Sequence, residues 1–194
     1  MNKRIKTAKR DHPTREKRDY VVIAGSGPSV QDYDGHVDVA TKKMSAPADY
    51  QFARHQAWYY KVLEENVIAR EKGRKPRWLQ PRMGFILYRN YETPNNKYPV
   101  EKIHNRYIAD WKYWDSYFKS FKPNNQNKKP SVGCCAVMAV MEMWAPDEVG
   151  LIGFDWVLDG NKEWLHDSRA ELDCILSLTD VKDLRTGEVL NKKT

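Results

Sequence analysis

Three short groups of residues in this sequence combine types and spacing that suit phosphate binding or proton transfer. The first is a turn that directly follows an apolar run and consists of Gly25, Ser26, Gly27, Pro28 and Ser29. Glycines at the end of a strand let backbone amides approach a phosphate, and serine hydroxyls add further donors. The same pattern also forms ordinary turns, and this turn has neither a GxGxxG fingerprint nor the lysine of a P-loop. A phosphate site and a plain turn are therefore both open here.

The second group begins an apolar stretch rich in Ala and Met, and it consists of Ser131, Val132 and Gly133. The Ser131 hydroxyl is predicted either to cap a helix or to share the helix N-terminus with an anion. Gly133 is a poor helix former within the first turn, so its presence needs a reason. Close approach of a ligand and close packing of the helix on a sheet explain it equally well.

The third group is His166 followed by Glu171. A histidine that lies after a strand end and just before a helix is well placed to act as a general base near neutral pH. The segment from Ser168 to Glu171 also has the S-x-x-E spacing of a capping box, which predicts a structural role for Glu171. His166 would then be free to face a site, although an ordinary surface or core histidine is the alternative.

The surrounding pattern predicts an α/β domain whose strands bring the three groups together. Strands and helices alternate, so we expect a single Rossmann-like domain, a mostly parallel sheet with helices on both faces. In such sheets ligands bind beyond the carboxyl ends of the strands, where all three groups would lie. The expected strands are 20–24, 84–88 and 148–154, and the expected helices are 50–72, 132–144 and 168–178.

Length and hydropathy set the class of protein. The chain has 194 residues, 41% of them hydrophobic, which is enough for one domain with a real core. No apolar run approaches the roughly 20 residues that a membrane span needs, and the first residues contain no hydrophobic stretch. We therefore expect a cytoplasmic protein with no membrane span and no secretory signal.

Positive charge is concentrated near the N-terminus. The net charge is +7, and residues 1–19 hold eight Lys and Arg against three acidic residues. We therefore expect a basic, flexible tail over residues 1–18 and a nucleotide-binding α/β domain over residues 19–194. Such a tail could bind nucleic acid, whereas a solvated terminus is the commoner case.

The cysteines and acidic pairs do not predict a metal site. Cys134, Cys135 and Cys174 lack the spacing of a zinc site or a disulfide framework, so we expect reduced thiols in the core. Asp155 and Asp159 could suggest a magnesium site, but they do not form a D-x-D after a strand. We expect Asp155 to orient the site from a strand end, and no metal to be required.

Taken together, the three groups resemble the sialyltransferases, most closely the bacterial glycosyltransferase family 42 and more distantly family 29. The resemblance rests on GSGPS after the first strand, on PSVGCCAVMAV with EVGLIGFDW, and on H-x4-E, and it covers residues 20–30 and 128–175. It implies metal-independent, inverting transfer of a sugar from a nucleotide donor, possibly a CMP-sugar, to the hydroxyl of a glycan or another acceptor, without a cofactor. It also implies that His166 is the catalytic base and that Glu171 supports it. The implied donor-binding residues are Gly25, Ser26, Gly27, Pro28, Ser29, Ser131, Val132, Gly133 and Asp155.

Two other functions are consistent with the same residues. A pterin diphosphokinase-like group shares the GxGPS turn. A nucleic-acid-binding protein or a DNA-modifying transferase would use the basic tail together with aromatic and basic residues such as Trp58, Tyr59 and Lys61. Core packing is the alternative explanation for those aromatic residues, because their spacing is helical.

Overall fold

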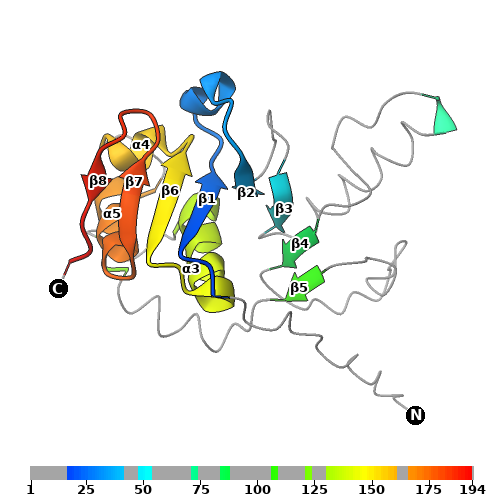
Figure 1. Ribbon diagram of the computed structural model, residues 1–194. Coiled ribbons are helices and arrows are strands. Elements are labelled where there is room, and N and C mark those ends of the chain that lie inside the picture. Colours follow the sequence, from blue (N-terminus) through cyan, green and yellow to red (C-terminus); the bar gives the residue numbers. More distant parts are fainter. Residues whose placement is uncertain are drawn as a thin grey trace, which may run out of the picture.

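The computed structural model describes residues 17–41, 48–53, 71–73, 84–87, 106–108, 121–123, 130–160 and 166–193. Within these ranges eight strands form one sheet in the order β5-β4-β3-β2-β1-β6-β7-β8 (Figure 1). Every neighbouring pair is parallel except the last, β7 with β8. The strands are β1 (Tyr20–Ala24), β2 (Val37–Thr41), β3 (Ala48–Ala53), β4 (Gly84–Leu87), β5 (Arg106–Ile108), β6 (Glu148–Ile152), β7 (Asp180–Asp183) and β8 (Val189–Leu190). The predicted α/β class with a mostly parallel sheet is confirmed.

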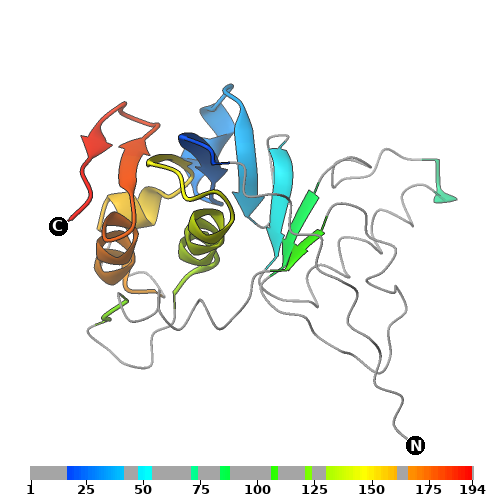
Figure 2. The same cartoon turned by 60° about the horizontal axis from the view of Figure 1, so that its bottom comes forward.

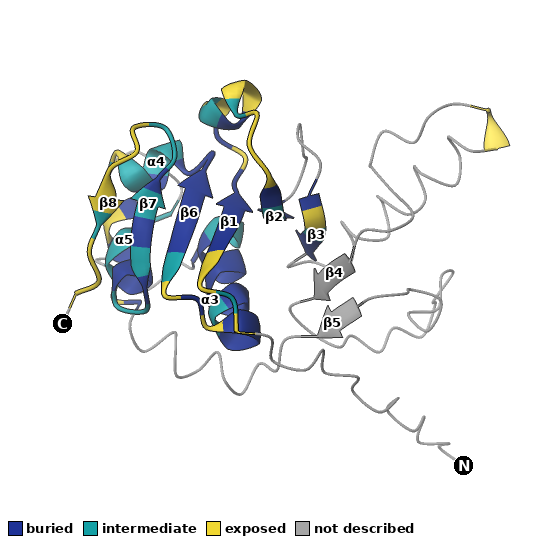
Figure 3. Cartoon of the chain, in the orientation of Figure 1, coloured by how far each residue is buried: buried dark blue, intermediate teal, exposed yellow. Residues whose placement is uncertain are grey.

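Strand β1 lies inside the sheet between β2 and β6, and both of its faces are covered. Residues 21–24 are all buried, which explains why this run is continuously apolar (Figure 3). Strands β2 to β5 follow one another on one side of β1, and strands β6 to β8 follow one another on its other side. The strand order therefore reverses between β1 and β6, and a crevice is expected beyond their carboxyl ends.

The described α-helices are α3 (Val132–Trp144), α4 (Asp155–Leu158) and α5 (Ser168–Leu176). Helices α3 and α5 contact each other and pack on the same face of the sheet, α3 on β1 and β2 and α5 on β7 (Figure 2). The predicted helix 132–144 is confirmed at both ends, and it stops where Ala145 adopts a left-handed φ of 44° before Pro146. The described part of the chain therefore shows long helices on one face, and helices on both faces remain a prediction.

The core between α3, α5 and the sheet contains the three cysteines. Cys134, Cys135 and Cys174 are fully buried and are not joined by disulfides, as predicted. A hydrogen bond with Cys174, together with burial and the nearby charge of Glu171, raises the pKa of the Cys134 thiol well above its usual value. These thiols are packing groups rather than nucleophiles.

Two predicted elements are wrong in part. The expected helix 50–72 begins instead with strand β3, in which Gln51 and Phe52 are both buried and the Gln51 amide donates to the Ala40 carbonyl oxygen in β2. The periodic pattern does not reveal this strand because strands buried on both faces do not alternate. The expected strand 148–154 ends at Ile152, because Gly153 turns the chain with a φ of 70° and Asp155 then starts α4.

Several sequence predictions fall outside the described residues. These are the tail over residues 1–16, most of the segment 54–72 with its aromatic side chains, and most of the loop 122–130. The last two residues of the predicted tail do belong to the folded domain, which is a correction. Arg18 donates to Asp38 over 2.9 Å, and its guanidinium lies 4.2 Å from the Trp144 ring centroid. None of the described helices has the length and apolar content required to cross a bilayer.

Candidate functional site

A pocket lies at the carboxyl ends of β1, β2 and β6, where the strand order reverses. All three groups of residues singled out in the sequence contribute to it, which supports the expectation that the sheet brings them together. The lining residues are Gly25, Ser26, Thr41, Ser131, Val132, Gly133, Gly153, Phe154, Trp156, Val157 and His166.

The glycine turn after β1 is packed directly against the turn after β6. The Gly25 N–H donates to the Ile152 carbonyl oxygen over 2.7 Å, and the Gly27 N–H donates to the Gly153 carbonyl oxygen over 2.8 Å. A Cβ atom on Gly25 would lie 2.2 Å from that Gly153 oxygen, so only glycine fits. Close contact between the two turns therefore accounts for the glycines, while the exposed Ser26 faces the pocket.

Ser29 and Asp155 brace this pair of turns and do not line the pocket. The Ser29 hydroxyl donates to Asp155 Oδ2 over 2.9 Å and accepts from the Gly153 N–H over 3.0 Å. A Cβ atom on Gly27 would lie 2.1 Å from the same Asp155 oxygen. The prediction that Ser29 and Asp155 hold a donor is not supported by these contacts, since both side chains are engaged in fixing the backbone. Pro28 likewise lies outside the pocket lining, at the start of a short 3₁₀ helix, Pro28–Asp32.

The start of α3 faces the pocket with its first backbone amides. Ser131 is the N-cap, as predicted, and its hydroxyl oxygen accepts from the Cys134 N–H. Val132 and Gly133 line the pocket and lie in the first turn of α3, where a helix leaves its amides without an intrahelical acceptor. A Cβ atom on Gly133 would lie 2.7 Å from the Phe154 ring, so the packing explanation for this glycine is favoured.

Glu171 does not form the predicted capping box. The N-cap of α5 is Asp167, whose side chain accepts from the Ala170 N–H, and the buried Ser168 hydroxyl has no hydrogen-bond partner among the described residues. The fully buried Glu171 carboxylate instead accepts two hydrogen bonds from Ser131, one from its N–H and one from its hydroxyl, each 2.6 Å long. The Ser131 hydroxyl therefore donates its proton to Glu171 and not to a ligand in the pocket.

His166 lies between the pocket and Glu171. It lines the pocket, its side chain is 28% exposed, and its Nδ1 atom is 4.0 Å from Glu171 Oε1. This placement agrees with the expectation that the ring faces a site. His166 is the only ionisable side chain among the lining residues in the part of the chain that the structure describes.

The sequence analysis missed five lining residues: Thr41, Gly153, Phe154, Trp156 and Val157. Gly153 and Phe154 lie within the expected strand 148–154, whereas Trp156 and Val157 come just after it. Thr41 ends β2, which the sequence analysis did not predict as a strand. The four residues after β6 could have been expected here, because parallel strands present their carboxyl ends at one edge of the sheet.

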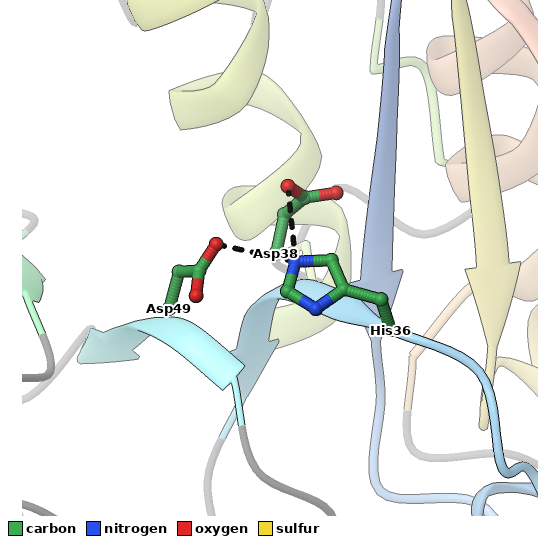
Figure 4. A group of neighbouring side chains, drawn as sticks. All are labelled: His36, Asp38 and Asp49. Atoms are coloured by element: carbon green, nitrogen blue, oxygen red, sulfur yellow. Dashed lines mark hydrogen bonds and ion pairs between the residues drawn. The ribbon is translucent and has the colours of Figure 1, made fainter.

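A second group of side chains could be considered for a metal ion. His36, Asp38 and Asp49 offer ligand atoms within 4.8 Å of one another, near the starts of β2 and β3 (Figure 4). His36 Nε2 lies 3.2 Å from Asp49 and 3.7 Å from Asp38. Both Asp38 oxygens already accept hydrogen bonds, one from Arg18 and one from the Val22 N–H. A guanidinium on a ligand oxygen opposes a cation, so the geometry favours an ion-pair cluster.

Asp155 and Asp159 both lie beside the guanidinium of Arg185. Arg185 lies 2.7 Å from Asp159 and 3.7 Å from Asp155, and it makes further hydrogen bonds to Asp183. These carboxylates therefore surround a guanidinium. The absence of a metal requirement stays a prediction.

Comparisons with protein-family models, with curated proteins and with solved structures found no match to this chain. The resemblance to the sialyltransferases therefore rests on the sequence motifs alone.

Proposed function

We propose that this pocket binds the phosphate of an activated nucleotide and that the protein is a glycosyltransferase resembling the sialyltransferases, built on a Rossmann-like domain. It would transfer a sugar from a nucleotide donor, possibly a CMP-sugar, to an acceptor hydroxyl. One observation carries the proposal: Val132 and Gly133 in the first turn of α3, Ser26 and His166 line a single pocket where the strand order reverses.

The amides at the start of α3 are the proposed phosphate site. They lie at the positive end of a helix of 13 residues, and the pocket gives a ligand access to them. The Ser26 hydroxyl adds a donor from the opposite turn. The Ser131 hydroxyl is excluded as a phosphate donor in this arrangement, because its proton is given to Glu171.

The aromatic lining suits the rest of the ligand. Phe154 and Trp156 follow β6 and supply apolar surface beside the polar helix start. A planar base or a sugar ring can pack on such surface while its phosphate reaches the amides. This division into one polar and one apolar side is typical of a nucleotide site.

His166 supplies the proton-transfer group. Its Nε2 atom takes the proton from the acceptor hydroxyl, and the acceptor oxygen bonds to the sugar carbon. The bond from that carbon to the phosphate oxygen breaks at the same time, and the electron pair leaves with the nucleotide phosphate. The α3 amides then stabilise the charge on the leaving phosphate.

The first test is a binding screen in the presence of EDTA, in which calorimetry compares CMP, UMP, GMP and AMP on the full chain. We expect CMP to bind more tightly than the other nucleotides. Binding of another nucleotide without CMP would overturn the CMP assignment. In a parallel titration without EDTA, binding of ATP only with magnesium would favour the diphosphokinase alternative. Binding of DNA that is lost with residues 1–16 and falls steeply with salt would favour the nucleic-acid alternative.

The second test is the substitution His166→Ala, assayed with the donor that the screen identifies. We expect turnover to fall by about 10²–10⁴-fold while nucleotide affinity stays nearly unchanged. The matched control is Arg169→Ala, since Arg169 lies in the first turn of α5 with a side chain that is 71% exposed. Normal turnover of the His166→Ala protein would remove His166 from the mechanism.

A further inference from the structure

Glu171 lies in α5 and is close to two other parts of the proposed site, Ser131 before α3 and His166. It lies in the first turn of α5, and its fully buried carboxylate reaches the first residue before α3. Because Asp167 caps α5, the Glu171 carboxylate is not needed by its own helix. Its two oxygens are held by two donors of one residue, Ser131, which fixes both the position and the plane of the carboxylate.

The oxygen that accepts from the Ser131 N–H also faces the histidine. Glu171 Oε1 lies 4.0 Å from His166 Nδ1, and Asp167 is the acidic neighbour of His166 along the chain. A fixed carboxylate beside Nδ1 favours the tautomer that carries its proton there. The Nε2 atom is then unprotonated, which is the form that a general base requires.

We infer that Glu171 is a positioning residue that sets the tautomer of His166, while Ser131 holds its carboxylate in place. The inference rests on the proposed function, in which His166 accepts the proton of the acceptor hydroxyl. It assigns Ser131 a second role besides capping α3, because the same hydroxyl that receives the Cys134 N–H also orients the Glu171 carboxylate.

The test is the substitution Glu171→Gln. Glutamine keeps the size of the side chain, and its amide can still accept from the Ser131 N–H and donate to the Ser131 hydroxyl oxygen. Only the negative charge beside His166 is lost. A purely structural role would thus be largely preserved, whereas an effect on the imidazole would not.

The readout is the ring-nitrogen spectrum of His166 in the full chain without substrate, at a pH where the imidazole is neutral. Its signals are identified by their loss in the His166→Gln protein. We expect the Nδ1–H tautomer to predominate in the wild-type protein and the Nε2–H share to rise several-fold in Glu171→Gln. Arg169→Gln is the matched control on the same helical turn, and it should leave the tautomer unchanged.

The enzymatic readout separates positioning from binding. With the donor found in the screen, Glu171→Gln should lower kcat by about 10- to 100-fold and leave the KM for the donor within about twofold. Ser131→Ala keeps the charge and should retain more of the Nδ1–H tautomer than Glu171→Gln does.

A wild-type His166 with its proton on Nε2, or a tautomer that does not respond to Glu171→Gln, would overturn the inference even if the protein transfers sugars. The tautomer measurement is made without a sugar donor, so its result does not depend on whether the donor assignment is right. The two failures are therefore distinguishable.

Discussion

Ser29 and Ser131 each donate a hydroxyl proton to a carboxylate, but only Ser131 lines the pocket. The comparison distinguishes a contact that holds two turns together from one that belongs to the proposed site. Ser29 donates to Asp155 over 2.9 Å, and Ser131 donates to Glu171 over 2.6 Å. Ser29 lies outside the pocket lining and links the turns after β1 and β6. Ser131 lies in the lining, and its carboxylate partner faces His166.

The two carboxylates also differ in what balances their charge. Asp155 is partly exposed and lies 3.7 Å from the Arg185 guanidinium, within a group of ion pairs. Glu171 is fully buried, and its described partners are the start of α3 and His166. A fully buried carboxylate depends on its hydrogen bonds, so it is retained where its placement matters.

The largest expected effect on stability is that of Glu171→Ala. Its loss removes a fully buried carboxylate, leaves a cavity in its place, and deprives the Ser131 N–H and hydroxyl of their acceptor. We expect a decrease of about 3 kcal/mol in the free energy of unfolding, measured by urea denaturation. Asp155→Ala is the matched comparison and should cost only about 1 kcal/mol, since the Asp155 side chain is partly exposed and its loss leaves no closed cavity. Equal losses in the two variants would contradict the distinction drawn between them.

The second effect concerns the ion pairs on the Asp155 side. Burial raises the pKa of the Asp183 carboxyl, but hydrogen bonds from the Arg185 side chain and backbone outweigh it and hold the pKa below its usual value. The carboxylate therefore contributes stability that is fully present above about pH 4 and is lost as the pH falls through the lowered pKa.

Arg185→Gln removes the guanidinium and should cost about 2 kcal/mol at pH 7. The difference between the wild-type and variant free energies of unfolding should narrow towards pH 2, because Asp183 becomes protonated in both proteins. Urea denaturation at several pH values checks this. A difference that is independent of pH would show that Arg185 acts through packing and not through its ion pairs.

The smallest expected effect is that of Ser168→Ala. A capping box would make this substitution cost about 1 kcal/mol. Within the described part of the chain the buried Ser168 hydroxyl has no partner, so its removal should be neutral or stabilise the protein by up to about 1 kcal/mol. Asp167→Ala, which removes the actual cap, should cost about 1 kcal/mol in the same thermal-denaturation series.

The sequence was informative where one pattern had one structural solution. The apolar, β-branched run from Val21 to Ala24 predicts a buried strand, and Ser131 before an apolar stretch predicts the start of a helix. The structure confirms both elements. The placement of three motifs in one pocket followed from the rule that parallel strands end at one edge.

The errors arose where a local pattern competed with a tertiary partner. The S-x-x-E spacing predicts a cap, but Asp167 one residue earlier provides it, and Glu171 is bound by Ser131, which lies 40 residues away in the sequence. Likewise, Ser29 has the right residue type for a phosphate donor, yet a carboxylate 126 residues away takes its proton. Spacing within a motif does not encode such long-range partners.

The central claim is that the first amides of α3 bind a phosphate, and an amide titration of the ¹⁵N-labelled full chain with CMP in EDTA tests it most directly. The account predicts that the Val132 and Gly133 amide signals move together and saturably, with a downfield proton shift typical of a new hydrogen bond to phosphate oxygen. Unchanged Val132 and Gly133 signals at millimolar CMP, with shifts elsewhere in the chain or with none at all, would contradict it.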